Sequence, residues 1–575
     1  MQREHLLKQI TDNPDKIWDI VIIGGGATGL GIAVDAASRG YSTVLLEQSD
    51  FSKGTSSRST KLVHGGVRYL AQGDISLVFE ALHERGLLMQ NAPHLVKNQA
   101  FIIPNYDWWE GPFYNIGMKV YDMMAGKLGL GPSEKISREE TMQAIPNLDE
   151  DHLNGGVIYH DGQFDDSRLA INLAQTAVEN GAVVLNYMRV SGLIKDRDNI
   201  VSGVKVVDQE MRYLKSIRSI SNYNSLEGNN ESNLPEEYSI QSKVVINATG
   251  VFVDQIIKMD DPLSKAMVRP SQGIHLVLDK SFLQGDSAIM IPKTSDGRVL
   301  FAVPWHGKVV VGTTDTPLNV DDASLEPRAL EHEIEFVLST ASQYLKKDPK
   351  RADVLSVFAG LRPLAAEEDG EISSNQRGSG KNSKKAINDK QNIDENTEEP
   401  STKEISRSHK LIISLSGLIT ITGGKWTTYR KMAEDTVNKA WIVGGLPEKQ
   451  CVTRNMPIHG YVKNIDFDAP AYFYGSDRSH IDDMIHQNPA LADRLHLDYE
   501  YNKAHVVWAV RHEMARTVED FLARRVRMLL LDARVSMETA HEVAEIMAQE
   551  LGRGEGWIKS QVKEYVEIAN GYILS

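Results

Sequence analysis

The chain has 575 residues, of which 41% are hydrophobic and 25% are charged. This composition is that of an ordinary soluble globular protein, and it excludes wholesale disorder, a collagen-like repeat and a polytopic membrane protein. The 78 acidic and 63 basic residues give a net charge of −15, which argues against a nucleic-acid partner. The single cysteine, Cys451, excludes an internal disulfide and a multi-cysteine metal site, and we predict no metal.

Two apolar stretches, 20–34 and 411–424, fall short of the roughly 20 apolar residues that a spanning helix needs, and glycines interrupt both. We expect buried strands that run into turns. The polar, charged start of the chain does not resemble a signal peptide, so we expect a reducing, cytoplasmic compartment. Peripheral attachment to a membrane remains open.

Along the chain, short runs rich in valine and isoleucine alternate with helical stretches, which predicts an α/β body. From about residue 504 onward helix follows helix, which predicts a helical C-terminal domain. Two polar segments, 222–237 and 371–405, are expected to be surface loops, the second of them mobile. We expect strands at 19–23, 43–47, 183–186, 244–247, 298–303 and 309–312, and helices at 167–180 and 326–344.

The strongest local signal is DIVIIGGGATGLG, in which a short strand leads into Gly24, Gly26 and Gly29 at G-x-G-x-x-G spacing. The first glycine permits a tight turn, the second lets a pyrophosphate approach the backbone, and the third allows close packing of helix on strand. Glu47 ends the next strand, where its carboxylate can accept hydrogen bonds from ribose hydroxyls and disfavours NADP. The sequence therefore predicts FAD or NAD.

Two later segments favour FAD. Residues 247–250 (NATG) and 416–425 (SGLITITGGK) each return the chain to the nucleotide domain, the second just before a helix opening at Trp426 or Thr427. A flavoenzyme needs such a late strand to place a helix N-terminus near the flavin, where negative charge develops on reduction. The cofactor contacts expected here are Ala248, Gly250, Gly424 and Lys425.

Longer motifs resemble a known family. SSRSTKLVHGGVRYL at 56–70, GLRPL at 360–364, GGKWTTYRKMAE at 423–434 and AVRHEMARTVEDFLARR at 509–525 closely resemble the FAD-dependent glycerol-3-phosphate dehydrogenases, with the related α-glycerophosphate oxidases. The resemblance implies an α/β fold with a glutathione-reductase-like, Rossmann-type FAD-binding domain, an interleaved mixed-sheet substrate domain and an α-helical C-terminal domain. No histidine or cysteine is well placed for covalent flavin attachment, so we expect non-covalent FAD.

The resemblance also suggests domain boundaries. We expect the FAD-binding domain at 17–100, 161–265 and 406–445, the substrate domain at 101–160 and 266–365, and the helical C-terminal domain at 446–575.

The implied reaction is oxidation of sn-glycerol 3-phosphate to dihydroxyacetone phosphate by hydride transfer to flavin N5. It requires cations for the phosphate and a base for the hydroxyl proton. We favour His64 over His275 as the base. The candidate phosphate anchors are Arg68, Arg362, Arg407 and Lys425, with Tyr69 and Thr427 as hydrogen-bond partners of substrate oxygens. By resemblance, the loop with Ser56, Ser57 and Lys61 lies along the FAD.

The resemblance leaves two electron acceptors open, a quinone and oxygen. The resemblance favours a membrane quinone, with the protein peripheral on the cytoplasmic face of the inner membrane, and it is compatible with a homodimer. The polar insertion raises the alternative of an oxidase that reduces oxygen to hydrogen peroxide. ARRVRMLLL at 523–531 could dock on anionic lipid, although a buried helix with its arginines in ion pairs is favoured. A second alternative is a flavin-binding protein without this activity, such as a tRNA-modifying flavoprotein.

Overall fold

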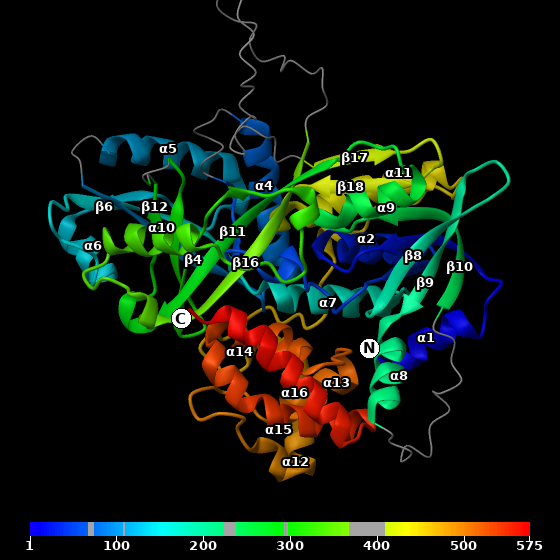
Figure 1. Ribbon diagram of the computed structural model, residues 1–575. Coiled ribbons are helices and arrows are strands. Elements are labelled where there is room, and N and C mark those ends of the chain that lie inside the picture. Colours follow the sequence, from blue (N-terminus) through cyan, green and yellow to red (C-terminus); the bar gives the residue numbers. More distant parts are fainter. Residues whose placement is uncertain are drawn as a thin grey trace, which may run out of the picture.

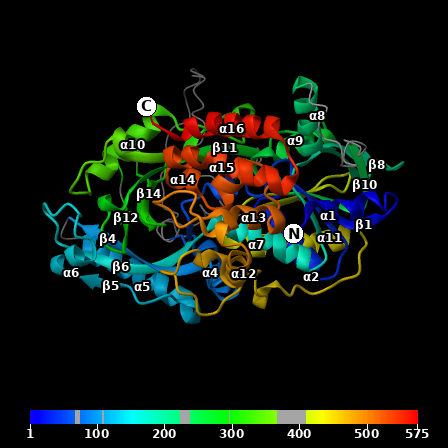
Figure 2. The ribbon, with the colours of Figure 1, turned by 90° about the horizontal axis from the view of Figure 1, so that it is seen from below.

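The computed structural model describes residues 1–66, 74–106, 110–221, 237–292, 294, 297–366 and 409–574. The expected insertion at 371–405 lies outside these residues, as does the expected loop at 222–237 except for its last residue. Within the described ranges, two sheets stand side by side and a group of helices covers one edge of both (Figures 1 and 2).

The first sheet contains β1 (Ile17–Ile23), β2 (Thr43–Leu46), β7 (Val183–Leu185), β8 (Met188–Lys195), β9 (Val201–Asp208), β10 (Glu237–Asn247), β17 (His409–Ile413) and β18 (Ile419–Gly423). Its centre is parallel, in the order β18, β10, β1, β2, β7. β17 pairs antiparallel with β18, and the hairpin of β8 and β9 pairs with the first half of β10. The strands expected at 19–23, 43–47 and 183–186 are thus confirmed to within two residues, whereas the strand expected at 244–247 begins seven residues earlier, at Glu237.

Helices cover the first sheet as expected for buried parallel strands. α2 (Ala27–Ser38) packs against both α7 (Asp166–Glu179) and α11 (Tyr429–Val443) (Figure 1). The apolar residues of β1 from Ile20 to Ile23 are almost completely buried, which explains why stretch 20–34 is so apolar without spanning a membrane. No helix in the described ranges is long and apolar enough to cross a bilayer.

The second sheet is mixed. It contains β3 (Leu62–Val63), β4 (Val96–Asn105), β5 (Glu134–Ile136), β6 (Gly155–Phe164), β11 (Val268–Asp279), β12 (Ala288–Ile291), β13 (Leu300–Trp305), β14 (Lys308–Gly312), β15 (Thr316–Pro317) and β16 (Val354–Ala365). β4 and β12 pair in parallel, and the other pairs are antiparallel. This sheet has two apolar cores. α4 (Ile75–Asn91) and α5 (Glu110–Ala125) pack on one of them, and α6 (Arg138–Ala144) and α10 (Glu331–Ser342) pack on the other.

The helix expected at 326–344 begins later than predicted, at Glu331. Pro327 disfavours helical geometry in the residue before it. Glu326 instead pairs with Arg58, with 2.8 Å between the guanidinium and the carboxylate.

The C-terminal part is helical, as expected. α12 (Arg478–Gln487), α13 (Lys503–His512), α14 (Met528–Leu531), α15 (Ala533–Leu551) and α16 (Glu555–Ala569) form the group at the bottom of Figure 1, and in Figure 2 they cross the middle of the molecule. The described residues also form α1 (Arg3–Thr11), α8 (Gln209–Ser221) and α9 (Val253–Asp260).

Buried ion pairs tie these helices to the body. Arg524, Arg525 and Arg527 are at most 2% exposed. The first two end a π-helical turn, η13 (Asp520–Arg525), and Arg527 lies two residues after it. Their partners are Asp50, Asp165, Glu519 and Asp520. The favoured interpretation of 523–531 is therefore confirmed, and the alternative that these arginines dock on lipid is wrong, because no guanidinium reaches the surface.

Candidate active site

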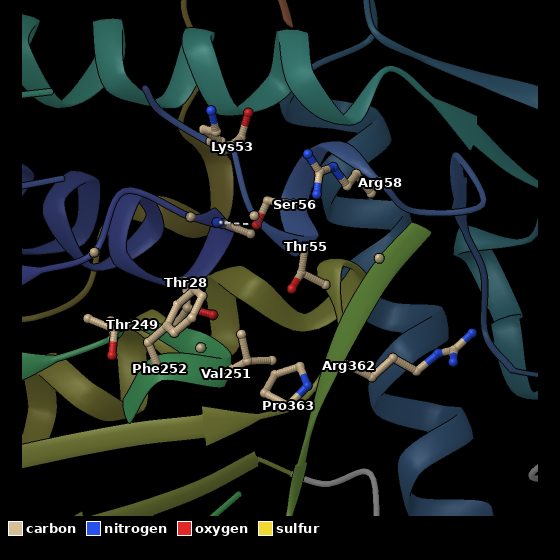
Figure 3. A pocket seen from close by; sticks show the side chains of 18 of the residues that line it. Thr28, Lys53, Thr55, Ser56, Arg58, Thr249, Val251, Phe252, Arg362 and Pro363 are labelled. Atoms are coloured by element: carbon tan, nitrogen blue, oxygen red, sulfur yellow. Dashed lines mark hydrogen bonds between the residues drawn. The ribbon is translucent and has the colours of Figure 1, made fainter. Parts of the chain in front are cut away.

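A cavity of about 420 Å³ lies where the carboxyl ends of the parallel strands meet the second sheet. Its walls come from the turn after β1, the loop around η1 (Thr55–Ser57), the turn after β10, strands β11 and β16, and the turn after β18 (Figure 3). Ligands of open α/β sheets bind at the carboxyl ends of the strands, so this is the expected place for a nucleotide.

The turn after β1 has the geometry of a pyrophosphate cradle. Gly24 has φ +110°, and a Cβ on Gly29 would stand 1.9 Å from the Gly24 carbonyl oxygen. A Cβ on Gly26 would lie 3.1 Å from Ser56 Oγ, on the wall of the cavity. α2 begins at Ala27, so the positive end of a helix faces this space. The residues therefore fit the phosphates of a dinucleotide.

Glu47 lies beside this turn. Its carboxylate accepts hydrogen bonds from the backbone N–H groups of Gly25 (2.6 Å) and Ser49 (2.9 Å). Burial raises the pKa of Glu47 above its ordinary value. The side chain lines the cavity together with Gln48, at the place where the sequence predicted contact with a ribose.

The loop after β2 was predicted to lie along the cofactor. Of its three predicted contacts, one lines the cavity and two do not. Ser56 lines the cavity, and its Oγ accepts a hydrogen bond from Ala27 N at 2.9 Å (Figure 3). Ser57 and Lys61 do not line it. The ammonium of Lys61 is fully buried and binds Asp166 at 2.7 Å and the Ser57 carbonyl at 2.6 Å. Burial lowers the pKa of Lys61.

Three predicted substrate residues line the cavity. Arg362, on β16, donates to Asp315 Oδ1 at 3.2 Å, to Thr313 Oγ1 at 3.1 Å and to the Thr314 carbonyl at 2.9 Å. Gly273 makes room for it, since a Cβ there would lie 2.2 Å from the guanidinium. Lys425 and Thr427 line the same cavity, at the start of η9 (Trp426–Thr428) and α11.

The two candidate histidines differ in environment. His64 is half-buried on the cavity wall, and its carbonyl accepts a hydrogen bond from Thr427 Oγ1 at 3.5 Å. His275 lines the same cavity but is buried, its ring is stacked on Phe358, and its Nε2 is 2.9 Å from Thr60 Oγ1. Burial lowers the pKa of His275 well below its ordinary value, so its imidazole is neutral at neutral pH.

The other predicted site residues fall into three groups: some line the cavity, one shapes the turn behind it, and three lie outside the described residues. Ala248, Gly250 and Gly424 line the cavity, whereas Gly29 lies behind the turn and shapes it. Arg68, Tyr69 and Arg407 lie outside the described residues.

Sequence reasoning missed several residues of the lining. Lys53, Thr55 and Arg58 flank Ser56 and reach the cavity (Figure 3). Trp426 lies beside Lys425, and its indole N–H donates to the Ser56 carbonyl at 2.9 Å. The sequence signal that could have found these lining residues is their position next to predicted ones.

Comparisons with known proteins agree with this site. A family described as "FAD dependent oxidoreductase" matches residues 19–383, and one described as "C-terminal domain of alpha-glycerophosphate oxidase" matches residues 419–557. The first match covers more than half of the chain, so the fold and site are those of an FAD-dependent oxidoreductase. The expected fold class and cofactor are confirmed.

Individual relatives show which FAD-dependent oxidoreductases the chain resembles in sequence and structure. The mitochondrial glycerol-3-phosphate dehydrogenase of Schizosaccharomyces pombe is 36% identical, over 99% of this chain and 89% of its own length. The mitochondrial enzyme of Bos taurus is 36% identical over 97% of this chain and 73% of its own. The crystal structure of glycerol-3-phosphate dehydrogenase from Bacillus halodurans, complexed with FAD, superposes with a TM-score of 0.73 at 27% identity, covering 100% and 98% of the two chains. The chain belongs to the FAD-dependent glycerol-3-phosphate dehydrogenase family, as its motifs predicted.

Proposed function

We propose that this chain oxidises sn-glycerol 3-phosphate to dihydroxyacetone phosphate, with FAD bound non-covalently, and passes the electrons to a membrane quinone. The observation that supports this most strongly is that one cavity is lined by the glycine cradle and also by Arg362, Lys425 and both candidate histidines. A pyrophosphate site and a small anion site in one space suit a flavin and a phosphorylated alcohol.

Arg362 and Lys425 are the proposed anchors of the substrate phosphate. The hydrogen bonds of Arg362 to Asp315, Thr313 and Thr314 hold its guanidinium plane in place before substrate arrives. A pre-oriented planar fork binds phosphate oxygens with little loss of side-chain entropy. Lys425 adds a second positive charge on the same cavity. Together they would hold the carbinol carbon in one position.

His64 is the proposed base for the substrate hydroxyl. Both histidines line the cavity, but His64 is half-buried, whereas His275 is buried, stacked on Phe358 and hydrogen-bonded to Thr60. We assign His275 the role of holding Thr60 in position. FAD, when bound, supplies the two-electron acceptor for the hydride. The start of η9 and α11 brings the positive end of a helix to the cavity, which would stabilise negative charge there.

The acceptor is proposed from the relatives, which are named dehydrogenases and not oxidases. The alternative is oxygen, and the observation that favours it is the match of residues 419–557 to a domain named after an oxidase. With a quinone acceptor, we propose that the protein lies peripherally on the cytoplasmic face of the inner membrane. A homodimer is compatible with this arrangement.

Reoxidation of the reduced enzyme separates the two acceptors. Enzyme reduced by glycerol 3-phosphate without oxygen should be reoxidised rapidly by a soluble quinone and slowly by oxygen, when both are followed by flavin absorbance in a stopped-flow instrument. Rapid reoxidation by oxygen with one hydrogen peroxide formed per substrate would contradict the quinone proposal and establish an oxidase.

A further inference from the structure

A buried carboxylate lies behind the part of the cavity wall that carries Arg362. It belongs to Glu333, the third residue of α10, which is 1% exposed, and α10 packs against β11 and β14. Glu333 does not line the cavity itself. A buried carboxylate is costly unless hydrogen bonds satisfy it, so its donors indicate what the group does.

The carboxylate accepts hydrogen bonds from four donors. Its Oε1 accepts from the hydroxyls of Thr314 at 2.8 Å and Thr316 at 2.6 Å. Its Oε2 accepts from the side-chain amide of Gln272 at 2.8 Å and from the backbone N–H of Leu330 at 3.0 Å. The bond to Leu330 caps the start of α10. The other three bonds leave the helix, to β11 and to the segment 313–316 that leads from β14 into β15.

The same two parts of the chain hold the guanidinium of Arg362, which extends from β16 (Figure 3). Arg362 donates to the Gln272 carbonyl on β11 at 3.3 Å. It also donates to groups of residues 313–315 at 2.9–3.2 Å. Gln272 and Thr314 therefore bind Glu333 through their side chains and Arg362 through their carbonyl oxygens.

The joint between these two parts of the chain is buried. Thr314 is 1% exposed and Gln272 is 2% exposed. The Thr314 hydroxyl also accepts a hydrogen bond from the backbone N–H of Ile274 on β11 at 3.0 Å, and the Gln272 amide also donates to the Arg328 carbonyl at 2.9 Å. Such a network is rigid, because movement of one member leaves another unpaired in surroundings of low dielectric. The segment that holds Arg362 is therefore fixed to β11 from behind.

We propose that Glu333 is a positioning residue for the phosphate anchor: by joining β11 to the segment 313–316, it fixes the plane in which the Arg362 guanidinium meets a phosphate dianion. The inference rests on the function proposed above, because it takes phosphate as the group that Arg362 binds. Without the joint, the guanidinium would have to be ordered when phosphate binds, which costs affinity. Because Glu333 is absent from the cavity wall, the effect falls on phosphate binding and not on hydride transfer.

The first test is binding of inorganic phosphate to the holoenzyme, measured by isothermal titration calorimetry. T314V/T316V removes two hydroxyls that donate to the carboxylate and keeps the Thr314 carbonyl that accepts from Arg362. This variant should bind phosphate about tenfold more weakly than the parent. The matched control, T141V/T539V, removes two buried hydroxyls that donate to helix carbonyls away from the cavity, and it should bind phosphate like the parent.

Steady-state kinetics with a soluble dye separate positioning from a merely structural role. T314V/T316V should raise KM for glycerol 3-phosphate by about tenfold and leave kcat within about twofold of the parent. In the R362A background the same pair of changes should have no further effect on KM, because the group to be positioned is gone. A structural role would instead produce equal losses in both backgrounds.

Equal losses in the two backgrounds would overturn the proposal, and so would phosphate binding by T314V/T316V that equals the parent's. If the double variant does not fold, T316V alone serves, because Thr316 is half-buried and its hydroxyl gives one of the four bonds; an increase of about threefold in the Kd of phosphate is expected. Failure of the proposed function looks different: phosphate binding would still weaken in T314V/T316V, but glycerol 3-phosphate would not reduce the flavin of the parent.

Discussion

Replacing Arg362 by alanine should lower kcat/KM for glycerol 3-phosphate by roughly a hundredfold, about 2.7 kcal/mol, mainly through KM. The lost group is a charged donor on the cavity wall, and Lys425 alone would have to hold the phosphate. FAD content should stay the same, because the glycine cradle and Glu47 lie elsewhere along the cavity. Steady-state kinetics with a soluble dye and the flavin absorbance of the purified variant measure both quantities.

Two further variants sharpen this result. Arg362→Lys keeps the charge but loses the planar fork, so it should recover only part of the affinity. Arg351→Ala is the matched control, since Arg351 pairs with Glu331 on the surface and lies away from the cavity. Loss of FAD from Arg362→Ala with an unchanged KM in the remaining holoenzyme would show that Arg362 is structural and not an anchor.

Replacing Asp50 by alanine should cost about 3–5 kcal/mol of the free energy of unfolding, because it removes the buried carboxylate that two buried guanidiniums share, and Arg524 keeps only Glu519 and Asp520. Asp50 binds Arg525 at 2.7 and 2.9 Å and Arg524 at 2.6 Å, and all three side chains are almost completely buried. Burial alone would raise the pKa of Asp50, but Arg525 and Arg524 hold it below its ordinary value. A depressed pKa means that the stabilisation is present at neutral pH and is lost only in acid, as the pH falls through that pKa.

Urea unfolding of the holoenzyme at pH 7 measures this loss. Asp286→Ala is the control, because Asp286 pairs with Lys280 on an exposed turn and its removal should leave the urea midpoint within error. A midpoint for Asp50→Ala equal to that of the control would contradict the role given to this cluster. The cluster joins the loop after β2 to the C-terminal helices, so the variant should also lose FAD more readily.

The parts of the fold that the sequence predicted well are those that local patterns determine. The strand, glycine turn and helix from Ile17 to Ser38 follow from apolar periodicity and from a turn that tolerates no Cβ at Gly29. α10 begins at Glu331 and not at Glu326 as predicted, and Pro327 disfavours helical geometry in the residue before it. The domain boundaries stay predictions.

The environment of charged residues could not be predicted from one sequence. Lys61 stands in a polar loop that resembles a cofactor contact, yet its partner Asp166 comes from the start of α7 and draws the ammonium into the interior. For the arginines of 523–531 the sequence favoured burial in ion pairs over docking on lipid, but it could not name the partner, because Asp50 lies more than 400 residues earlier in the chain. The roles of His64, His275 and Lys425 remain proposals, and Arg68, Tyr69 and Arg407 lie outside the described residues.

The most direct test of the proposed function is the flavin absorbance of the purified enzyme when glycerol 3-phosphate is added without oxygen. The proposed function predicts that the flavin absorbance bleaches on addition of glycerol 3-phosphate and that glycerol at the same concentration has little effect, because it offers no phosphate to Arg362 and Lys425. An absorbance that stays unchanged at saturating glycerol 3-phosphate, in a protein that has retained its FAD, would contradict the proposed function.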